Sequence, residues 1–217
     1  MKFGRPRRLD ERRHVGFDWI KKGNGCRMRA FLSIPLTDEL HQSIETLQRR
    51  LDEDARGVRW TRAQNCHLTL KFFGDVSPSV AEKIVEALAV VGPQFDPFSI
   101  QLKGIGQFPP RGPLSVLWVG VQAGEAPLRA LEQSIHEALQ SAEISFDRKS
   151  FSPHLTIGRA RRGDNSFLRN SSEHKQLDLG SLRVGEFCLM ESVLQPGGPI
   201  YTVKRRFALG SPDDLKM

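Results

Sequence analysis

Apolar residues recur along the chain with two different spacings. Three segments repeat them every three or four positions, as the buried face of a helix does. We predict amphipathic helices over residues 37–51, 78–91 and 127–141. Thr37 or Asp38 can cap the first helix, and Ser77 can cap the second with Pro78 in its first turn.

Other segments are short, rich in Val, Ile, Leu and Phe, and bounded by Gly, Pro or polar residues, which is typical of strands. We predict strands at residues 29–34, 66–73, 98–103, 115–121, 152–159, 185–195 and 201–209. The last two are expected to form a hairpin. The Gly- and Pro-rich residues 104–112 are predicted to be a loop between two strands, and a polar loop is expected from residue 161 to about residue 175.

Two of the predicted strands carry the same short motif, His67-Leu68-Thr69-Leu70 and His154-Leu155-Thr156-Ile157. Side chains alternate between the two faces of a strand, so the His and Thr of each motif share one face. Leu68, Leu70 and Phe72 are expected on the opposite, buried face. Two such strands could bring two imidazoles together in a polar cleft. The alternative is shared strand chemistry, because Thr favours strands and a half-buried His can be purely structural.

The motifs and the segments around them resemble the two-histidine (2H) phosphoesterase superfamily. Within it, they are most similar to the RNA 2′,3′-cyclic phosphodiesterases, also described as 2′-5′ RNA ligase-like proteins. The matching segments follow the family's order, at residues 28–35, 67–75, 117–121 and 151–159. The resemblance implies an α+β fold with two antiparallel β-sheet lobes related by pseudo-twofold symmetry. Helices would cover the outer faces, and the active-site cleft would lie between the lobes.

The motif residues suit the opening of a 2′,3′-cyclic phosphate. This reaction needs a water deprotonated on one side and a leaving ribose oxygen protonated on the other, which two imidazoles can provide near neutral pH. Two Thr hydroxyls can donate hydrogen bonds to the phosphate oxygens. By resemblance, His67 is the proton donor and His154 the proton acceptor, the product carries a 2′-phosphate, and Thr69, Thr156 and Arg159 bind the substrate. No metal or cofactor is expected.

Several nearby residues are open to two interpretations. Phe108 is expected to bind substrate by stacking on a base, against the alternative that it anchors its loop. Lys71 either extends the anion site on the motif face or is an exposed strand lysine. Trp118 is expected in the core. Cys66 should also point to the core, as a buried thiol rather than a nucleophile.

The composition is that of a globular protein with an anionic partner. Lys and Arg exceed Asp and Glu by 32 to 25 among 217 residues, which favours an anionic partner. No apolar run approaches the roughly 20 residues of a membrane span. The three cysteines have no metal-like spacing, which suggests reduced thiols. We therefore expect a cytoplasmic monomer that acts on RNA with 2′,3′-cyclic phosphate ends or on small cyclic nucleotides, without membrane attachment.

The basic residues are concentrated at the N-terminus. Residues 1–27 hold nine lysines and arginines against three acids. We predict an extension without fixed structure there, a phosphoesterase domain over residues 28–210 and a short tail over residues 211–217. The extension could engage RNA phosphates or remain solvated. Alternatively, it could be specific to one lineage, or it could be left untranslated if translation starts at Met28.

Four other functions remain open from the sequence. A 2′-5′ RNA ligase would join a 2′,3′-cyclic end to a 5′-hydroxyl by the reverse chemistry. A non-catalytic RNA-binding protein would not need the imidazoles. A metallohydrolase would need carboxylate ligands, yet Asp75 is the only acid near either motif. A nucleotide or ADP-ribose cyclic phosphate would use the same site as an RNA end.

Overall fold

The computed structural model describes residues 27–53, 55, 57–163 and 176–210, with the backbone alone at residues 161–163. Residues 1–26 and 211–217, which make up almost all of the predicted extension and the whole tail, lie outside this part. The described residues form three α-helices: α1 (Asp38–Leu51), α2 (Pro78–Leu88) and α3 (Glu125–Ser141). Two short 3-10 helices are η1 (Ala63–Asn65) and η2 (Gly92–Gln94). The strands are β1 (Met28–Ile34), β2 (Val58–Trp60), β3 (Leu68–Val76), β4 (Phe98–Phe108), β5 (Leu114–Ala123), β6 (His154–Gly163), β7 (Asp178–Val184), β8 (Glu186–Gln195) and β9 (Gly198–Ala208).

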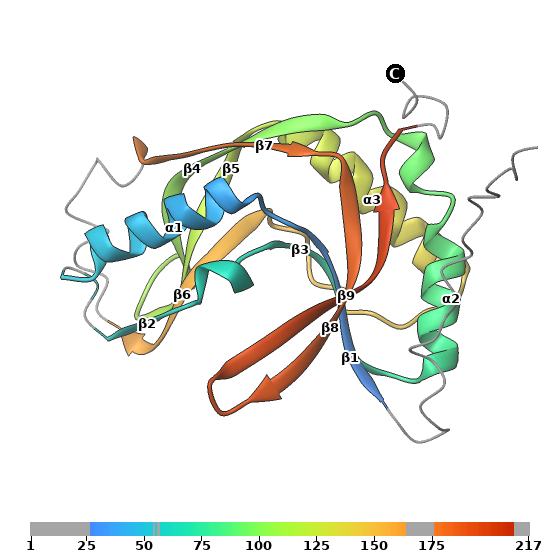
Figure 1. Ribbon diagram of the computed structural model, residues 1–217, viewed down its shortest axis with the longest axis horizontal. Coiled ribbons are helices and arrows are strands. Elements are labelled where there is room, and N and C mark those ends of the chain that lie inside the picture. The colour runs from blue at the N-terminus through green and yellow to red at the C-terminus, as the bar shows by residue number, and fades with distance from the viewer. Residues whose placement is uncertain (1–26, 54, 56, 164–175, 211–217) are drawn as a thin grey trace, which may run out of the picture.

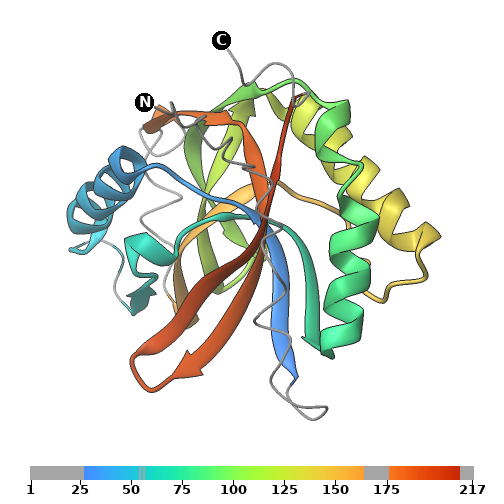
Figure 2. The same ribbon diagram turned by 45° about the vertical axis from the view of Figure 1, so that its right-hand side comes forward.

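Eight of the nine described strands pair in the order β7-β4-β5-β6-β3-β1-β8-β9, the short β2 pairs with β6, and every pairing is antiparallel. The two motif strands, β3 and β6, lie at the centre. Four strands on one side (β3, β1, β8 and β9, the first half-sheet) mirror four on the other (β6, β5, β4 and β7, the second half-sheet). This is the predicted α+β arrangement of two pseudo-symmetric lobes. The lobes are continuous as one curled sheet, because Leu68 pairs with Leu155 at the junction (Figures 1 and 2).

The helices begin where the sequence predicts. The Thr37 hydroxyl accepts a hydrogen bond from the Leu40 amide at 3.4 Å, and the Ser77 hydroxyl accepts one from the Val80 amide at 3.3 Å. Each side chain satisfies an amide that has no partner within its helix. The second helix ends at Leu88, before the predicted residue 91, and the chain then continues into η2. None of the described helices is long and apolar enough to span a membrane.

The two halves exchange their covering helices. α1 follows β1 of the first half-sheet but packs beside β7 of the second, and its Gln48 side chain donates a hydrogen bond to the Ile157 carbonyl of β6 at 3.0 Å. α3 follows β5 of the second half-sheet, yet its Glu132 pairs with Lys71 of β3. α2 packs on α3. Figure 1 shows α1 in blue over β4–β7, and α2 and α3 on the opposite side.

Two features of the second half-sheet differ from the sequence prediction. β4 runs through Gly104 and Gly106 to Phe108, so most of the predicted loop is strand. Gly106 is needed there because a Cβ at this position would lie 2.2 Å from the Trp118 ring on β5. β7 was not predicted, since Asp178 and Gly180 interrupt its apolar pattern.

Candidate active site

The motif strands line a cleft between the half-sheets. Its cavity of about 270 Å³ lies mainly on the His67 side and is slightly below the roughly 300–1,000 Å³ of common ligand pockets. Three predicted substrate-binding residues, Thr69, Thr156 and Arg159, line it together with His67. The other lining residues are Arg29, Phe31, Thr61, Asn65, Phe72, Ser192, Leu194, Pro199 and Tyr201.

Both motif histidines are anchored in the same way. Nδ1 of His67 lies 2.8 Å from the carbonyl oxygen of Asn65, and Nδ1 of His154 lies 2.7 Å from that of Ser152. A carbonyl oxygen only accepts hydrogen bonds, so Nδ1 carries a proton in each ring. Nε2 is therefore the atom that can accept a proton in the neutral ring or donate one in the charged ring.

Aromatic rings enclose His67. Phe31 stacks on it at 4.8 Å between centroids, and Tyr201 meets it edge-on at 5.2 Å. Burial lowers the pKa of His67 from 6.5 to about 4, against the opposing effect of the Asn65 carbonyl. Arg159 and His154 lower this pKa further through their positive charges.

His154 has its own aromatic neighbours. Phe108 meets it edge-on at 4.9 Å, and the Trp118 ring lies 6.3 Å away. Burial lowers the pKa of His154, the Ser152 carbonyl opposes this shift, and the charge of Arg159 adds to it. Trp118 was expected in the core, and this expectation is wrong. It pairs with Thr156 across β5 and β6 and is half-buried beside His154.

Each motif strand has a bulge directly after its threonine. Thr69 pairs with Ser33 but Lys71 pairs with Leu32, so β3 has one extra residue there. In β6, Thr156 pairs with Trp118 and Gly158 pairs with Leu117, which leaves one extra residue again. A bulge shifts the alternation of side chains by one position.

The bulges determine which residues reach the cleft. The third residue after each threonine, Phe72 on β3 and Arg159 on β6, faces the cavity. For Arg159 this agrees with the predicted substrate role. For Phe72 it corrects the expectation of a core position on the Leu68 face, because the extra residue turns its side chain over.

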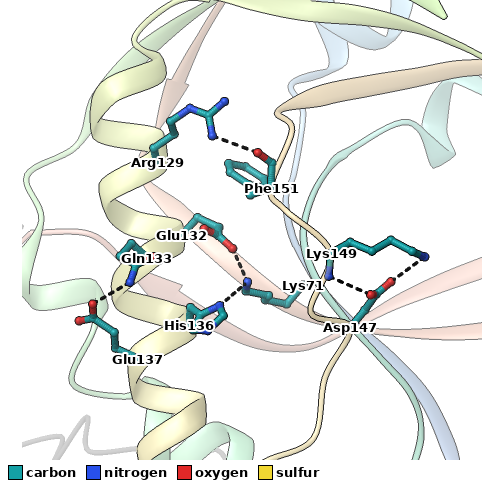
Figure 3. A network of polar contacts seen from close by, with 9 residues as sticks. All are labelled: Lys71, Arg129, Glu132, Gln133, His136, Glu137, Asp147, Lys149 and Phe151. Carbon is teal, nitrogen blue, oxygen red and sulfur yellow. Dashed lines mark hydrogen bonds and ion pairs between the residues drawn. The ribbon is translucent and has the colours of Figure 1, made fainter. Parts of the chain in front are cut away.

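Lys71 is turned away from the cleft by the same bulge. It is 5% exposed, so it neither extends the anion site nor lies on the surface, and both interpretations are wrong. Its ammonium pairs with Glu132 and lies 3.1 Å from Nδ1 of His136, both on α3, and 5.1 Å from the Phe146 ring centroid. An ammonium only donates, so His136 accepts through Nδ1. Figure 3 shows this network, which ties the bulge to the outer helix.

A buried thiol, the possible metal ligands and two residues that were not predicted complete the description of the site. The Cys66 thiol is buried, donates to the Thr156 carbonyl at 3.4 Å and has its pKa raised to about 12 by burial, so it is a structural thiol as predicted. Within residues 27–53, 55, 57–163 and 176–210, no three His, Cys, Asp or Glu side chains are grouped to hold a metal ion. Sequence reasoning missed Arg29 and Tyr201. Strand alternation with Phe31 could have indicated Arg29, whereas Tyr201 comes from the distant edge strand.

Comparison with known proteins places this geometry in a family. The model of the LigT-like phosphoesterases matches residues 34–118 and again residues 119–201, one match for each half of the chain. The RNA 2′,3′-cyclic phosphodiesterase of Archaeoglobus fulgidus is 33% identical over 180 residues, covering 83% of this chain and 99% of the relative. Its counterpart from Methanothermobacter thermautotrophicus is 32% identical over 186 residues, covering 84% and 100%.

Solved structures share the fold. TT0787 of Thermus thermophilus superposes with a TM-score of 0.68 and 27% identity, covering 85% of this chain and all of the other. Apo LigT of Escherichia coli superposes with a TM-score of 0.71 at 23% identity, covering 85% and 99%. The chain therefore belongs to the LigT-like phosphoesterase family of the 2H superfamily.

Proposed function

We propose that this protein hydrolyses RNA 2′,3′-cyclic phosphate ends to 2′-phosphomonoesters, by acid–base catalysis that uses two histidines and no metal. The observation that carries the proposal is the matched anchoring of His67 and His154. Each ring is fixed through Nδ1, offers Nε2 for proton transfer, and is followed by a threonine on the cleft side. The names of the relatives agree with this activity.

The reaction follows from these groups. Nε2 of His154 removes a proton from water, which attacks phosphorus as the bond to O3′ breaks. Nε2 of His67 donates its proton to the departing O3′, and the phosphate stays on O2′. Thr69 and Thr156 donate hydrogen bonds to the non-bridging oxygens, and Arg159 balances their negative charge.

The position of the cavity supports this assignment of roles. An in-line displacement puts the ribose with its leaving oxygen on one side of phosphorus and the water on the other. The cavity lies on the His67 side and has room for the nucleoside, whereas His154 needs space for water alone. This position favours His67 as the proton donor.

The low pKa of His67 conflicts with a role as proton donor in the free protein, and bound substrate resolves the conflict. Burial and the nearby positive charges favour the neutral form of this ring. A phosphodiester anion in contact with the rings favours their charged form, and it also offsets the charge of Arg159. We therefore expect substrate binding to raise the pKa of both histidines.

Phe108 and Trp118 favour a second candidate function, the joining of a 2′,3′-cyclic end to a 5′-hydroxyl. These rings pack together 5.4 Å apart beside His154, where the 5′-hydroxyl of an acceptor nucleoside would replace water. Nε1 of Trp118 is buried without a hydrogen-bond partner among the described residues. Stacking of a base on Phe108 stays a prediction under either function.

Hydrolysis of an RNA oligonucleotide with a 2′,3′-cyclic phosphate end, with chelator present, tests the proposal. We expect turnover to a 2′-phosphate, and a loss of at least about 100-fold in kcat for His67→Ala and for His154→Ala. His41→Ala, which changes a histidine on α1 outside the cavity, is the matched control. Adding an oligonucleotide with a 5′-hydroxyl tests ligation. Full activity of either motif variant would contradict the mechanism. Loss of the wild-type activity when chelator is added would also contradict it.

The cellular setting is proposed on the same basis. Cys66 and Cys188 are free and buried, which suits the reducing cytoplasm. Both motif histidines come from one chain, so a monomer contains a complete site.

A further inference from the structure

The cleft contains a second guanidinium group that the proposed chemistry does not use. Arg29 of β1 lines the cavity, on the same strand as Phe31, which stacks on His67. It is exposed to solvent, and it forms no hydrogen bond or ion pair with any described residue. The acid opposite it in the strand register is Asp75, which is also exposed. Arg29 is therefore available to bind an anion.

The bulge in β3 gives Arg29 its position. The guanidinium carbon lies 4.9 Å from the centroid of the Phe72 ring, the ring that the bulge turns into the cleft. A cation over an aromatic face is held by attraction without using its N–H donors. The five donors of Arg29 thus stay free for a planar or tetrahedral anion.

Arg29 and Arg159 occupy opposite half-sheets of the cleft. Arg159 follows the His154 motif at the same spacing at which Phe72 follows the His67 motif. The bulge in β6 therefore brings a cation into the cleft, and the bulge in β3 brings in an aromatic ring on which a cation packs. Burial raises the pKa of Tyr201, and the charges of Arg159 and Arg29 both oppose this rise. Both guanidinium groups therefore act within the cavity that the nucleoside would fill.

We propose that Arg29 forms a second anion subsite, which takes the phosphate on the 5′ side of the terminal nucleoside and so favours ends of RNA chains over cyclic mononucleotides. This inference rests on the proposed function, in which the ribose lies on the His67 side. The 5′ oxygen belongs to that ribose, so a phosphate attached there leaves the cavity on the β1–β3 side. Arg159 meets the cyclic phosphate and Arg29 meets the next one.

Three substrates test the subsite: adenosine 2′,3′-cyclic phosphate, its 5′-phosphorylated form, which adds one phosphate, and a dinucleotide that ends in the same cyclic phosphate, which adds that phosphate together with a second nucleoside. The ratio of kcat/KM for the dinucleotide to kcat/KM for the mononucleotide is the readout. We expect Arg29→Met to lower this ratio about tenfold, because a hydrogen-bonded charge pair is lost. The slope of log kcat/KM against log salt for the dinucleotide should become shallower by about one.

Arg183→Met is the matched control, because Arg183 is an exposed arginine on β7 outside the cavity. Its ratio should equal that of the wild type. An unchanged ratio in Arg29→Met overturns the subsite. The assignment to RNA chains is overturned if kcat/KM rises above that of adenosine 2′,3′-cyclic phosphate for its 5′-phosphorylated form but not for the dinucleotide. Failure of the wild type to hydrolyse any of the three substrates would refute the proposed function instead, so the two failures are distinguishable.

Discussion

Replacement of His67 by glutamine should remove much of the protein's sensitivity to mild acid. The unfolded chain binds a proton at His67 with a pKa near 6.5, whereas the folded chain does so only near 4. Between these values the unfolded state holds more protons, and acid therefore favours unfolding. The stability that comes from keeping this ring neutral is complete above pH 6.5 and is lost as the pH falls through 4.

The size of the effect follows from the two pKa values. At about pH 5 the unfolded state is favoured by roughly 2 kcal/mol through this one proton, out of about 3 kcal/mol when the pH is well below 4. These are upper figures, because part of the ring reaches solvent and water screens its charge. About pH 5 is a better condition for the measurement than a pH below 4, since most carboxylates are still ionised at pH 5 and do not contribute to the loss of stability.

Urea denaturation of the wild type and of His67→Gln at about pH 7.5 and about pH 5 measures this difference. We expect the free energy of unfolding to fall by roughly 2 kcal/mol more in the wild type than in the variant. The variant His154→Gln should reduce the acid-induced loss of stability by less than His67→Gln does. The reason is that the rings around His67 enclose it more fully than Phe108 and Trp118 enclose His154. Equal losses in the wild type and His67→Gln would show that the folded state does not keep His67 neutral at about pH 5.

Three further results are expected. Lys71→Met leaves Glu132 buried without its partner and should cost about 3–5 kcal/mol of stability, most of which Lys71→Met combined with Glu132→Leu should recover in urea denaturation. Gly106→Ala forces the Trp118 ring from its place and should cost about 1–3 kcal/mol with a change in Trp fluorescence, whereas Gly185→Ala, with no atom near its added Cβ, should change neither. The pH profile of kcat/KM, which reports the free enzyme, should have its maximum below pH 6.5, and that of kcat should have its maximum at higher pH. A kcat/KM maximum above pH 7 would contradict the lowered pKa values.

The side chains that face the cleft could be predicted from the sequence where strand alternation holds, and they were predicted wrongly where a bulge interrupts it. His67 and Thr69 share a face because no extra residue lies between them. Lys71 and Phe72 were assigned to the wrong faces because the bulge depends on how β1 pairs with β3, a long-range property that local residues do not reveal. Gly158 indicates a bulge in the second motif strand, because glycine within a strand often marks one, whereas Leu70 does not indicate the bulge in the first.

Glycine was the other source of error. Gly106 suggested a loop because glycine favours turns, yet its role is to leave space for a neighbouring indole. The helices were predicted well, because caps such as Thr37 and Ser77 act within one turn and need no information from distant strands.

The exchange of helices between the halves makes this molecule a single cooperative unit. Although the family model matches the chain twice, each match holds strands of both half-sheets: residues 34–118 include β3 of the first half-sheet and β4 of the second, and residues 119–201 include β6 and β7 of the second and β8 of the first. A fragment that holds one match would therefore complete neither half-sheet, and the apolar faces that α1 and α3 cover would lack strands. The duplicated segments thus depend on each other for folding, and the two motif histidines are gained or lost together in one unfolding transition.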